Sequence, residues 1–355
     1  MNPIRLPSHA RVLVVVLRRL GDVLLATPLI RSVKRAFPDA SIEALVFVGT
    51  EGILAGNPDL ARVIAIPPRP SASESLALLR RLRRRYDLAI STQTGDRPTT
   101  LACVAGRQSA GLLEPAGLSS AIKRFVLSRS CPSDRHLHRV LDNLSLAAAL
   151  GIPAITEVVG PAGVPPASEM PVQPCAVVHA APMFRFKRWA IDGWRALATA
   201  LRERGLSIAV TGANADRDYL DEVWSGCEVT RLDGSTDWPA LAALIRAARV
   251  YVGPDTAVTH LAAATGTPTV ALFGPTDPRI WGPWPVGGLE RPWAAAGTIQ
   301  RRGNVWLVQN PLPCLPCQLE GCDRHINSRS QCLDELSASQ VLSAVEQALM
   351  MEQAV

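Results

Sequence analysis

A strand that turns sharply into a capped helix is the clearest candidate for chemistry. The apolar run 250–252 is typical of a buried strand, and a Gly-Pro pair interrupts it. Asp255 and Thr256 are residue types that cap helices, and 257–265 is compatible with a short helix. The first amides of such a helix can bind an anion, and His260 lies on the same helical face as Thr256. The alternative is an ordinary strand–helix turn with a core histidine.

A second candidate follows the first predicted strand, residues 12–17. The loop contains Arg18, Arg19, a glycine that permits a tight turn, and Asp22. Asp22 opens the next predicted helix, where a carboxylate commonly serves as a cap. In a strand-end loop that faces a cleft, the same carboxylate can act as a general base toward a hydroxyl nucleophile.

Two further loops after predicted strands have the composition of ligand-binding segments. Residues 184–189 place three cations beside aromatic residues and ahead of a helix, which suits a phosphate clamp made by Lys187 and Arg188. The cations also fit the solvated entry of a helix. Residues 211–216 combine a glycine with polar capping residues and could hold a ribose or a base.

The elements that position these loops alternate between strand and helix, which predicts βαβ units and parallel sheets. In the first half we expect strands at 12–17, 42–48, 62–66 and 88–91, and helices at 22–37 and 74–86. In the second half we expect strands at 175–180, 206–211, 229–232, 249–252 and 269–273, and helices at 191–204, 238–248, 257–265 and 337–350. Ligands of such sheets bind outside the carboxyl ends of the strands.

A change of composition separates the two halves. Residues 151–174 contain six prolines and three glycines without a period, which indicates an interdomain linker. We therefore expect an α/β protein with two doubly wound, Rossmann-like domains whose parallel sheets face a central cleft. The predicted boundaries are 1–160 for the first Rossmann-like domain, 161–174 for the linker, 175–336 for the second Rossmann-like domain, and 337–355 for a terminal helix.

Charge is distributed unevenly over the 355 residues. Residues 1–165 hold 21 Lys/Arg against 12 Asp/Glu, whereas residues 166–355 hold 16 against 19. The basic first half suggests an anionic partner, such as a membrane surface or a phosphorylated lipid. The densest basic run, 80–85, also fits the solvated face of a helix. Nucleic acid is disfavoured because aromatic residues make up only 5% and no known nucleic-acid module is present.

Four of the eight cysteines cluster near the C-terminus, in the segment 314–332. Cys314, Cys317, Cys322 and Cys332 have a spacing compatible with Zn²⁺ or an iron–sulfur cluster of structural role. Reduced or redox-active thiols are the alternative. We expect no transmembrane helix, because no run of eighteen apolar residues occurs, and no signal peptide, because arginines end the first apolar run.

Together these motifs resemble the heptosyltransferase family, glycosyltransferase family nine, whose members have the two-domain GT-B fold. The resemblance spans most of the chain in the family's order. It rests on Leu20-Gly21-Asp22 with Thr27-Pro28, Lys187-x-Trp189, Thr211-Gly212-Ala213, Gly253-Pro254-Asp255-Thr256 with His260, and Phe273-Gly274-Pro275-Thr276-Asp277-Pro278.

The resemblance implies a sugar-nucleotide donor, typically ADP-L-glycero-D-manno-heptose, and a lipopolysaccharide inner-core acceptor. It implies that Asp22 is the catalytic base and that Arg18 and Arg19 lie on the acceptor side. The donor-binding residues it implies are Lys187, Arg188, Thr211, Gly212, Asp216, Asp255, Thr256, Ala257 and His260. Ala257 stands where many members have glycine, and the match at Asp216 is loose. The family also implies a cytoplasmic protein, peripheral at the inner membrane.

The expected reaction is an inverting transfer that needs no metal, because fixed cations and helix amides take the place of Mg²⁺. Two alternatives stay open: a GT-B-fold sugar-nucleotide epimerase, and a non-catalytic protein that binds phosphorylated glycolipid. A nicotinamide dehydrogenase is disfavoured because the Gly-x-Gly-x-x-Gly fingerprint is absent. No motif in the sequence predicts which acceptor hydroxyl is used, which base the nucleotide carries, or the oligomeric state.

Overall fold

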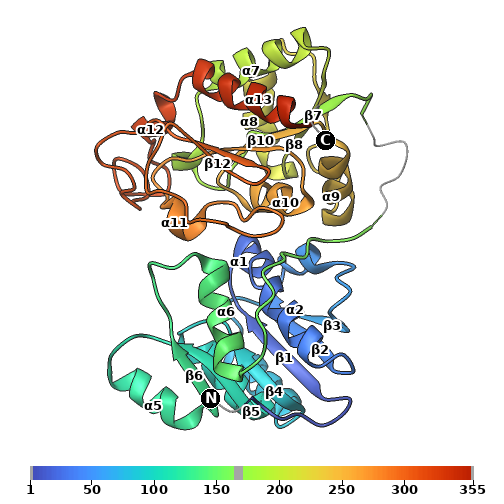
Figure 1. Cartoon of the computed structure of the whole chain (residues 1–355), viewed down its shortest axis with the longest axis vertical. Helices are drawn as coiled ribbons and strands as arrows, with labels where there is room; N and C mark the ends of the chain where they lie inside the picture. Colours follow the sequence, from blue (N-terminus) through green and yellow to red (C-terminus); the bar gives the residue numbers. More distant parts are fainter. Residues whose placement is uncertain (1–2, 164–170, 353–355) are drawn as a thin grey trace. The chain divides into compact units, whose positions relative to one another are not determined.

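The computed structural model describes residues 3–163 and 171–352, and the chain divides into two compact units, residues 1–161 and 162–355 (Figure 1). Each unit contains one sheet with helices packed on it. The predicted linker 161–174 includes residues 164–170, which lie outside the described residues. The last three residues of the predicted terminal segment 337–355 also lie outside them.

Unit 1 is built on a six-stranded sheet of order β3-β2-β1-β4-β5-β6, in which all neighbouring strands are parallel. Its strands are β1 (Arg11–Val16), β2 (Ser41–Phe47), β3 (Arg62–Ile66), β4 (Tyr86–Ser91), β5 (Gly106–Leu113) and β6 (Arg129–Pro132). Its helices are α1 (Leu20–Leu24), α2 (Thr27–Ala36), α3 (Ala72–Leu82), α4 (Asp96–Ala105), α5 (Leu118–Val126) and α6 (Arg139–Leu150), with the 3-10 turn η1 (Glu51–Leu54). The central β1 is buried from its second residue onward, as its unbroken valine and leucine run predicts.

Unit 2 is built on a seven-stranded sheet of order β12-β13-β11-β10-β7-β8-β9, in which only the edge strand β12 is antiparallel to its neighbour among the described residues. Its strands are β7 (Cys175–His179), β8 (Ser207–Thr211), β9 (Thr230–Arg231), β10 (Val250–Pro254), β11 (Thr269–Leu272), β12 (Ile299–Arg302) and β13 (Val305–Val308). Its helices are α7 (Ile191–Glu203), α8 (Arg217–Trp224), α9 (Trp238–Ala247), α10 (Ala257–Thr265), α11 (Pro278–Trp281), α12 (Gln331–Asp334) and α13 (Ala338–Glu352), with the 3-10 turns η3 (Arg185–Lys187) and η4 (Asn214–Asp216).

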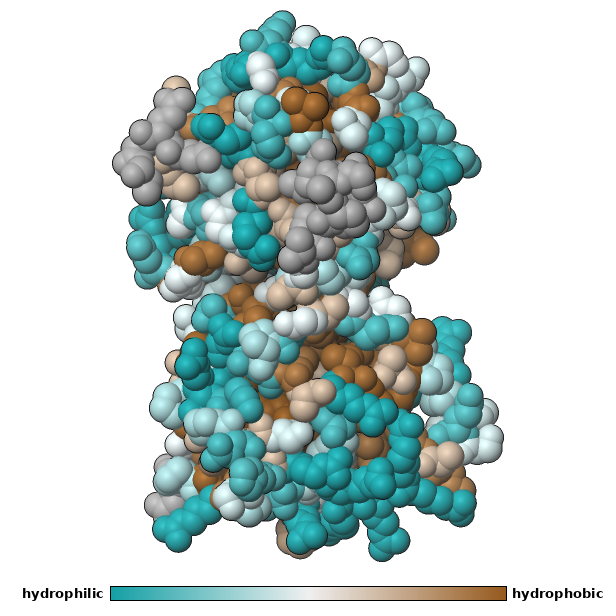
Figure 2. Space-filling model, turned by 90° about the vertical axis from the view of Figure 1, so that its right-hand side faces the viewer, coloured by the Kyte–Doolittle hydropathy of each residue, from teal (hydrophilic) through white to brown (hydrophobic). Residues whose placement is uncertain are grey.

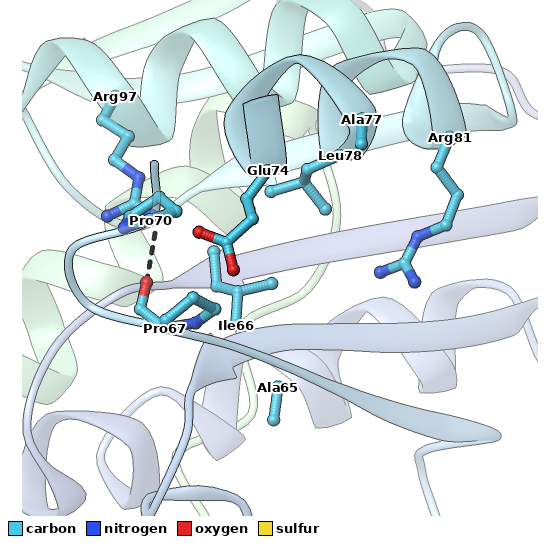
Figure 3. A pocket seen from close by; sticks show the side chains of 9 residues that line it. All are labelled: Ala65, Ile66, Pro67, Pro70, Glu74, Ala77, Leu78, Arg81 and Arg97. Atoms are coloured by element: carbon cyan, nitrogen blue, oxygen red, sulfur yellow. Dashed lines mark hydrogen bonds between the residues drawn. The ribbon is translucent and has the colours of Figure 1, made fainter. Parts of the chain in front are cut away.

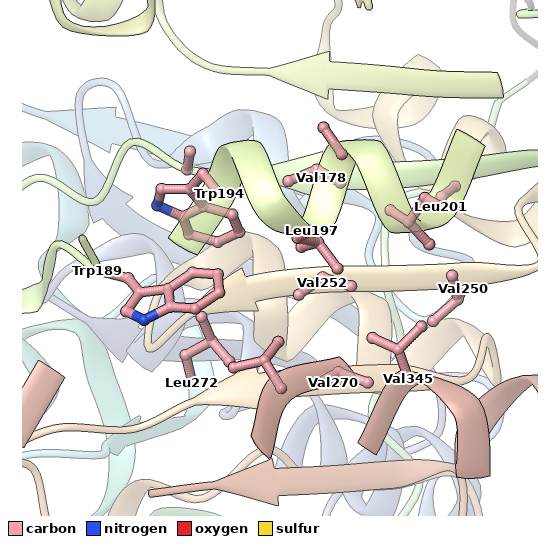
Figure 4. Packing of buried hydrophobic residues seen from close by; sticks show 14 of the residues in the cluster. Val178, Trp189, Trp194, Leu197, Leu201, Val250, Val252, Val270, Leu272 and Val345 are labelled. Carbon is pink, nitrogen blue, oxygen red and sulfur yellow. The ribbon is translucent and has the colours of Figure 1, made fainter. Parts of the chain in front are cut away.

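The core of unit 2 lies between the sheet and the pair α7 and α13 (Figure 4). Trp189 and Trp194 pack edge to face, with ring centroids 4.9 Å apart. The indole nitrogen of Trp189 donates to the Leu336 carbonyl at 2.7 Å, which ties the loop after β7 to the segment that leads into α13. The predicted terminal helix therefore exists and belongs to unit 2.

Several predicted elements need correction. The helix predicted at 22–37 is two helices, α1 and α2, because Pro28 lacks the amide that would continue the first helix and instead starts the second. The helix predicted at 74–86 begins earlier, at a capping box on Ser71, and ends at Leu82. Gly253 and Pro254 do not interrupt β10, which continues through both and pairs there with β11.

The chain also contains elements that the sequence pattern did not reveal. In unit 1 these are β5, β6, α4, α5 and α6, and in unit 2 they include the β12–β13 hairpin that follows β11. Among the described residues no helix has the length and apolarity to cross a bilayer. The face shown in Figure 2 is mainly hydrophilic, with smaller groups of hydrophobic residues, which is ordinary for a globular surface.

Candidate active site

The β10–α10 junction of unit 2 has the geometry of an anion site. Thr256 caps α10, and its hydroxyl accepts a hydrogen bond from the Thr259 amide at 3.4 Å. The amides of Ala257 and Val258 lie in the first turn, where a helix supplies no acceptor for them. Glycine is required at position 253 in β10, since a Cβ there would lie 2.3 Å from the Tyr251 hydroxyl. These features confirm the predicted helix 257–265 and its Thr256 cap.

Lys187 and Asp255 are brought together by the fold, although the chain separates them widely. The Lys187 ammonium lies 2.5 Å from the Asp255 carboxylate and 3.2 Å from the Asp255 carbonyl oxygen. The pair is shielded from solvent, with 7% of the Asp255 side chain and 21% of the Lys187 side chain exposed. Lys187 is held at the end of η3, where the Phe186 carbonyl accepts a hydrogen bond from Ser330.

Asp255 is ionised despite its burial. Burial alone would raise its pKa, but the charge of Lys187, with hydrogen bonds from Lys187 and Thr276, outweighs burial and lowers the pKa. The carboxylate offsets part of the charge of the Lys187 ammonium and fixes its position. Asp255 therefore positions Lys187, and it leaves the amides of α10 as an additional source of positive potential.

His260 lies beside this pair from within α10. Its Nε2 is 3.8 Å from a carboxylate oxygen of Asp255, and the side chain is buried. Burial lowers the pKa of His260 to about 4, so the imidazole is neutral at physiological pH. Its Nδ1 is buried and has no hydrogen-bond partner in the part of the chain that the structure describes.

The β8 end adds a second group of predicted residues. Thr211 is the last residue of β8, and its hydroxyl lies 3.1 Å from Nδ1 of His179, at the end of the neighbouring β7. A Cβ at Gly212 would lie 2.5 Å from Cδ1 of Leu220, so a larger residue would displace that side chain. Asp216 accepts a hydrogen bond from the Ala213 amide at 2.9 Å, so it stabilises the local turn.

Arg188 does not join Lys187. Its guanidinium carbon stacks 3.7 Å from the centroid of the Tyr219 ring. Both residues line a cavity of about 430 Å³ whose walls also include Arg185 and Arg329. None of the other predicted donor-binding residues lines this cavity. The two neighbouring cations that the sequence suggested as one clamp thus lie in different surroundings.

Asp22 of unit 1 lies in an environment suited to a base. It is the third residue of α1, whose N-cap is Arg19, so the interpretation as a cap is wrong. One of its carboxylate oxygens is buried and has no hydrogen-bond partner among the described residues. Burial raises the pKa of Asp22, while the charges of Arg18, Arg139 and Arg19 act in the opposite direction.

The basic run 80–85 forms the end of α3 and the turn that follows, and its arginines are exposed. Arg84 donates to the carbonyls of Gly106 and Arg107, at 3.0 and 3.2 Å. Arg81 lines a cavity of about 290 Å³ between α3 and the end of β3 (Figure 3). Arg97 reaches the same cavity from α4 and donates to the Pro67 carbonyl. Most of this run therefore fits the interpretation as the solvated face of a helix.

The four C-terminal cysteines lie near one another without forming a metal-binding group among the described residues. Cys332 is buried, and the nearby Cys317, Cys314 and Cys322 add to the effect of its burial and raise its pKa to about 12. Within residues 3–163 and 171–352, no group of three or more His, Cys, Asp or Glu side chains is placed to hold a metal ion. The predicted metal site at Cys314, Cys317, Cys322 and Cys332 is therefore not formed by the described residues.

Sequence reasoning missed several residues that complete these surroundings. His179 and Tyr251 contact predicted donor residues, and Arg139 acts on Asp22 from the start of α6. Thr276, which the sequence marked only as part of the motif 273–278, donates a hydrogen bond to Asp255. His179 is the last residue of a buried strand, as Thr211 is, and this position could have revealed it. Arg139 lies in a region where no element was predicted, so nothing in the sequence pattern indicated that it is close to Asp22.

Solved structures define the class of protein. Escherichia coli heptosyltransferase WaaC, solved with ADP and with ADP-2-deoxy-2-fluoro heptose, is similar with a TM-score of 0.71 and 21% identity, over 95% of this chain and 99% of that chain. This likeness shows the GT-B fold, in which two Rossmann-like units are joined in one chain. The expected fold class is thereby confirmed.

Sequence comparison then defines the family. The model of glycosyltransferase family 9 (heptosyltransferase) matches residues 75–287. Lipopolysaccharide heptosyltransferase 3 of Escherichia coli is 31% identical over 309 residues, which cover 74% of this chain and 83% of the relative. Lipopolysaccharide heptosyltransferase 1 of Pseudomonas aeruginosa is 29% identical over 348 residues, or 94% and 93% of the two chains. The chain belongs to glycosyltransferase family 9, and it is a glycosyltransferase.

Proposed function

We propose that this glycosyltransferase moves a heptose from ADP-heptose to the inner core of lipopolysaccharide, with inversion at the anomeric carbon. The proposal is supported by the names of the relatives, which are lipopolysaccharide heptosyltransferases, and by the WaaC structures with ADP and an ADP-heptose analogue. The observation that carries it is the β10–α10 junction, where Lys187 and a capped helix supply positive potential for a diphosphate.

In the proposed reaction, an acceptor hydroxyl gives its proton to the Asp22 carboxylate. The hydroxyl oxygen forms a bond to the anomeric carbon while the bond from that carbon to the diphosphate oxygen breaks. ADP leaves with the electron pair of that bond, so one displacement inverts the configuration. In this scheme Asp22 comes from unit 1 and the donor-binding residues come from unit 2.

Within this scheme, the Ala257 and Val258 amides and the Lys187 ammonium stabilise the diphosphate as negative charge develops on it. We assign Thr256, Asp255 and His260 to the same donor site, with neutral His260 as a hydrogen-bonding group. Thr211, Gly212 and Asp216 are assigned to the nucleoside side. Arg18 and Arg19, both exposed, are assigned to the anionic acceptor.

Dependence on an acceptor tests this function. We expect ADP release from ADP-heptose only when a lipopolysaccharide core acceptor that lacks the heptose is added, because the sugar needs a second substrate. Free ADP would be measured by a coupled assay, and the product sugar by mass spectrometry. Conversion of the donor without acceptor would favour the epimerase alternative, and acceptor binding without turnover would favour the non-catalytic alternative.

We also propose that the transfer needs no metal ion. Asp255, the carboxylate beside the proposed diphosphate site, is paired with Lys187 and is thus not available as a cation ligand. We expect initial rates to change less than about twofold when EDTA replaces Mg²⁺, since the positive charges that stabilise the leaving group belong to the protein. An EDTA-sensitive rate that Mg²⁺ restores would contradict this proposal, and an unrelated Mg²⁺-dependent enzyme assayed in parallel would verify the chelation.

We further propose that the protein acts in the cytoplasm, peripheral to the inner membrane. The basic first half and the lipid-linked nature of the proposed acceptor support this location.

A further inference from the structure

The helix α5 of unit 1 has an exposed apolar face. Leu118, Ile122, Phe125 and Val126 lie at positions i, i+4, i+7 and i+8, which places them on one side of the helix. Their exposed fractions are 80%, 58%, 91% and 51%. Single exposed apolar residues are common on protein surfaces, but four on one face of a nine-residue helix form a patch that indicates an interaction site.

The fold holds α5 in this orientation through its polar side. The residues of α5 that are buried are Ser120 and Lys123. The Lys123 ammonium donates to the Thr94 carbonyl at 2.6 Å and pairs with Asp96 at 2.6 Å. A helix of a globular protein normally buries its apolar side and exposes its polar side. In α5 the arrangement is reversed, and Figure 1 shows the helix at the edge of unit 1.

The segment that carries this face is basic in sequence. Residues 107–139, which run from β5 to the start of α6, contain six Lys/Arg and two Asp/Glu. Arg124 is exposed on α5 itself, Arg129 begins β6 and is partly exposed, and Arg135, in the turn after β6, is exposed and pairs with Glu114. Exposed apolar side chains next to cations are the combination by which short amphipathic helices bind the interface of an anionic bilayer.

The size of the patch argues against a second copy of the chain as its partner. A nine-residue helix is only about 14 Å long, so its face offers far less than the roughly 600 Å² per partner of a stable interface. A bilayer surface has no such requirement, because charge attraction acts together with insertion of a few side chains.

We propose that the exposed face of α5 is the membrane contact of this protein, with Phe125 and Leu118 inserted between anionic lipid headgroups. This proposal names the surface that would hold the protein at the membrane, and its biological purpose rests on the proposed peripheral location. Binding to vesicles that lack lipopolysaccharide tests the surface by itself, so a failed test of glycosyl transfer and a failed test of α5 would be distinguishable.

The experiment uses the full-length protein and co-sedimentation with vesicles made of equal parts phosphatidylcholine and phosphatidylglycerol. The double variant Leu118→Ser/Phe125→Ser is expected to lower the partition coefficient by about 10–100-fold, as expected when large apolar side chains no longer leave water. Arg124→Glu is expected to weaken binding to these vesicles, and wild-type binding is expected to fall on vesicles of phosphatidylcholine alone and with added salt.

The control variant is Leu76→Ser, in which a half-exposed leucine of α3, ahead of the basic run, is changed in the same way. It is expected to bind as the wild type does. Equal binding by the α5 double variant and the wild type would overturn the proposal, and so would a loss caused by Leu76→Ser alone. Light scattering provides the other decisive outcome: a wild-type dimer that the α5 change dissociates would identify the face as an interface between copies.

Discussion

Asp22→Asn is expected to reduce turnover by roughly 10²–10⁴-fold while donor binding stays near the wild-type value. The amide has almost the same shape as the carboxylate but cannot accept the acceptor's proton. The burial that raises the pKa of Asp22 makes the carboxylate a stronger base than an exposed aspartate would be. The measurement is a steady-state assay of ADP release, together with calorimetric titration of the donor. Wild-type turnover in Asp22→Asn would exclude this residue as the base.

The pH profile gives an independent check on the same residue. The base works only when it is ionised, so kcat/KM should fall as the pH drops through the pKa of Asp22. Because that pKa is raised, the fall should occur above the pH at which an ordinary aspartate protonates. The residual kcat/KM of Asp22→Asn should not show this fall at low pH. As a matched control, Asp39→Asn makes the same change at an exposed position of unit 1. It should change neither the turnover nor the fall of kcat/KM at low pH.

Lys187→Met is expected to have two separable effects. It removes the only close cation of the buried Asp255 among the described residues, so the free energy of unfolding should decrease by about 3 kcal/mol at neutral pH. It also removes a charge from the proposed diphosphate site, so donor affinity should fall. Chemical denaturation would measure the first effect, and donor titration the second. Arg185→Met, which removes an exposed cation of the same loop, should change stability little.

The double variant Lys187→Met/Asp255→Asn separates the two effects. Without the carboxylate there is no unpaired buried charge, so much of the lost stability should return, while donor affinity should stay low. The deficit of the single variant should also shrink as the pH falls. Asp255 has a lowered pKa in the wild type, so its pairing stabilises the fold above the unfolded-state pKa and is lost in acid. A double variant that recovered donor binding would show that Lys187 acts only through Asp255.

Most of the recognisable chemistry could be predicted because it is local in the chain. A run such as Val12 to Val16 specifies a buried strand, and a capping threonine followed by nine helix-compatible residues specifies α10. Loops at the carboxyl ends of parallel strands then contain the candidates for catalysis, because a doubly wound sheet gathers those ends at one edge. The motif order was sufficient to indicate the family.

Elements without a local signature escaped prediction. The strand β5 contains two glycines, a serine and a glutamine, and such a composition gives neither an alternating nor a continuous apolar pattern. It is a strand because it pairs with β4 and β6 in the sheet. The hairpin β12–β13 likewise depends on pairing with β11. Tertiary pairing decides such segments because it satisfies their backbone hydrogen bonds.

By itself the sequence determined which residues lie at the ends of strands, where helices begin, and which family the chain resembles. The tertiary structure decided which charges meet: Lys187 with Asp255, Arg139 with Asp22, and Lys123 with Asp96 beneath an apolar helix face turned outward. The physical reason is range. Propensity and capping depend on neighbours within a few residues, whereas pKa values, ion pairs and exposed surfaces depend on distances in space that only the packed chain establishes.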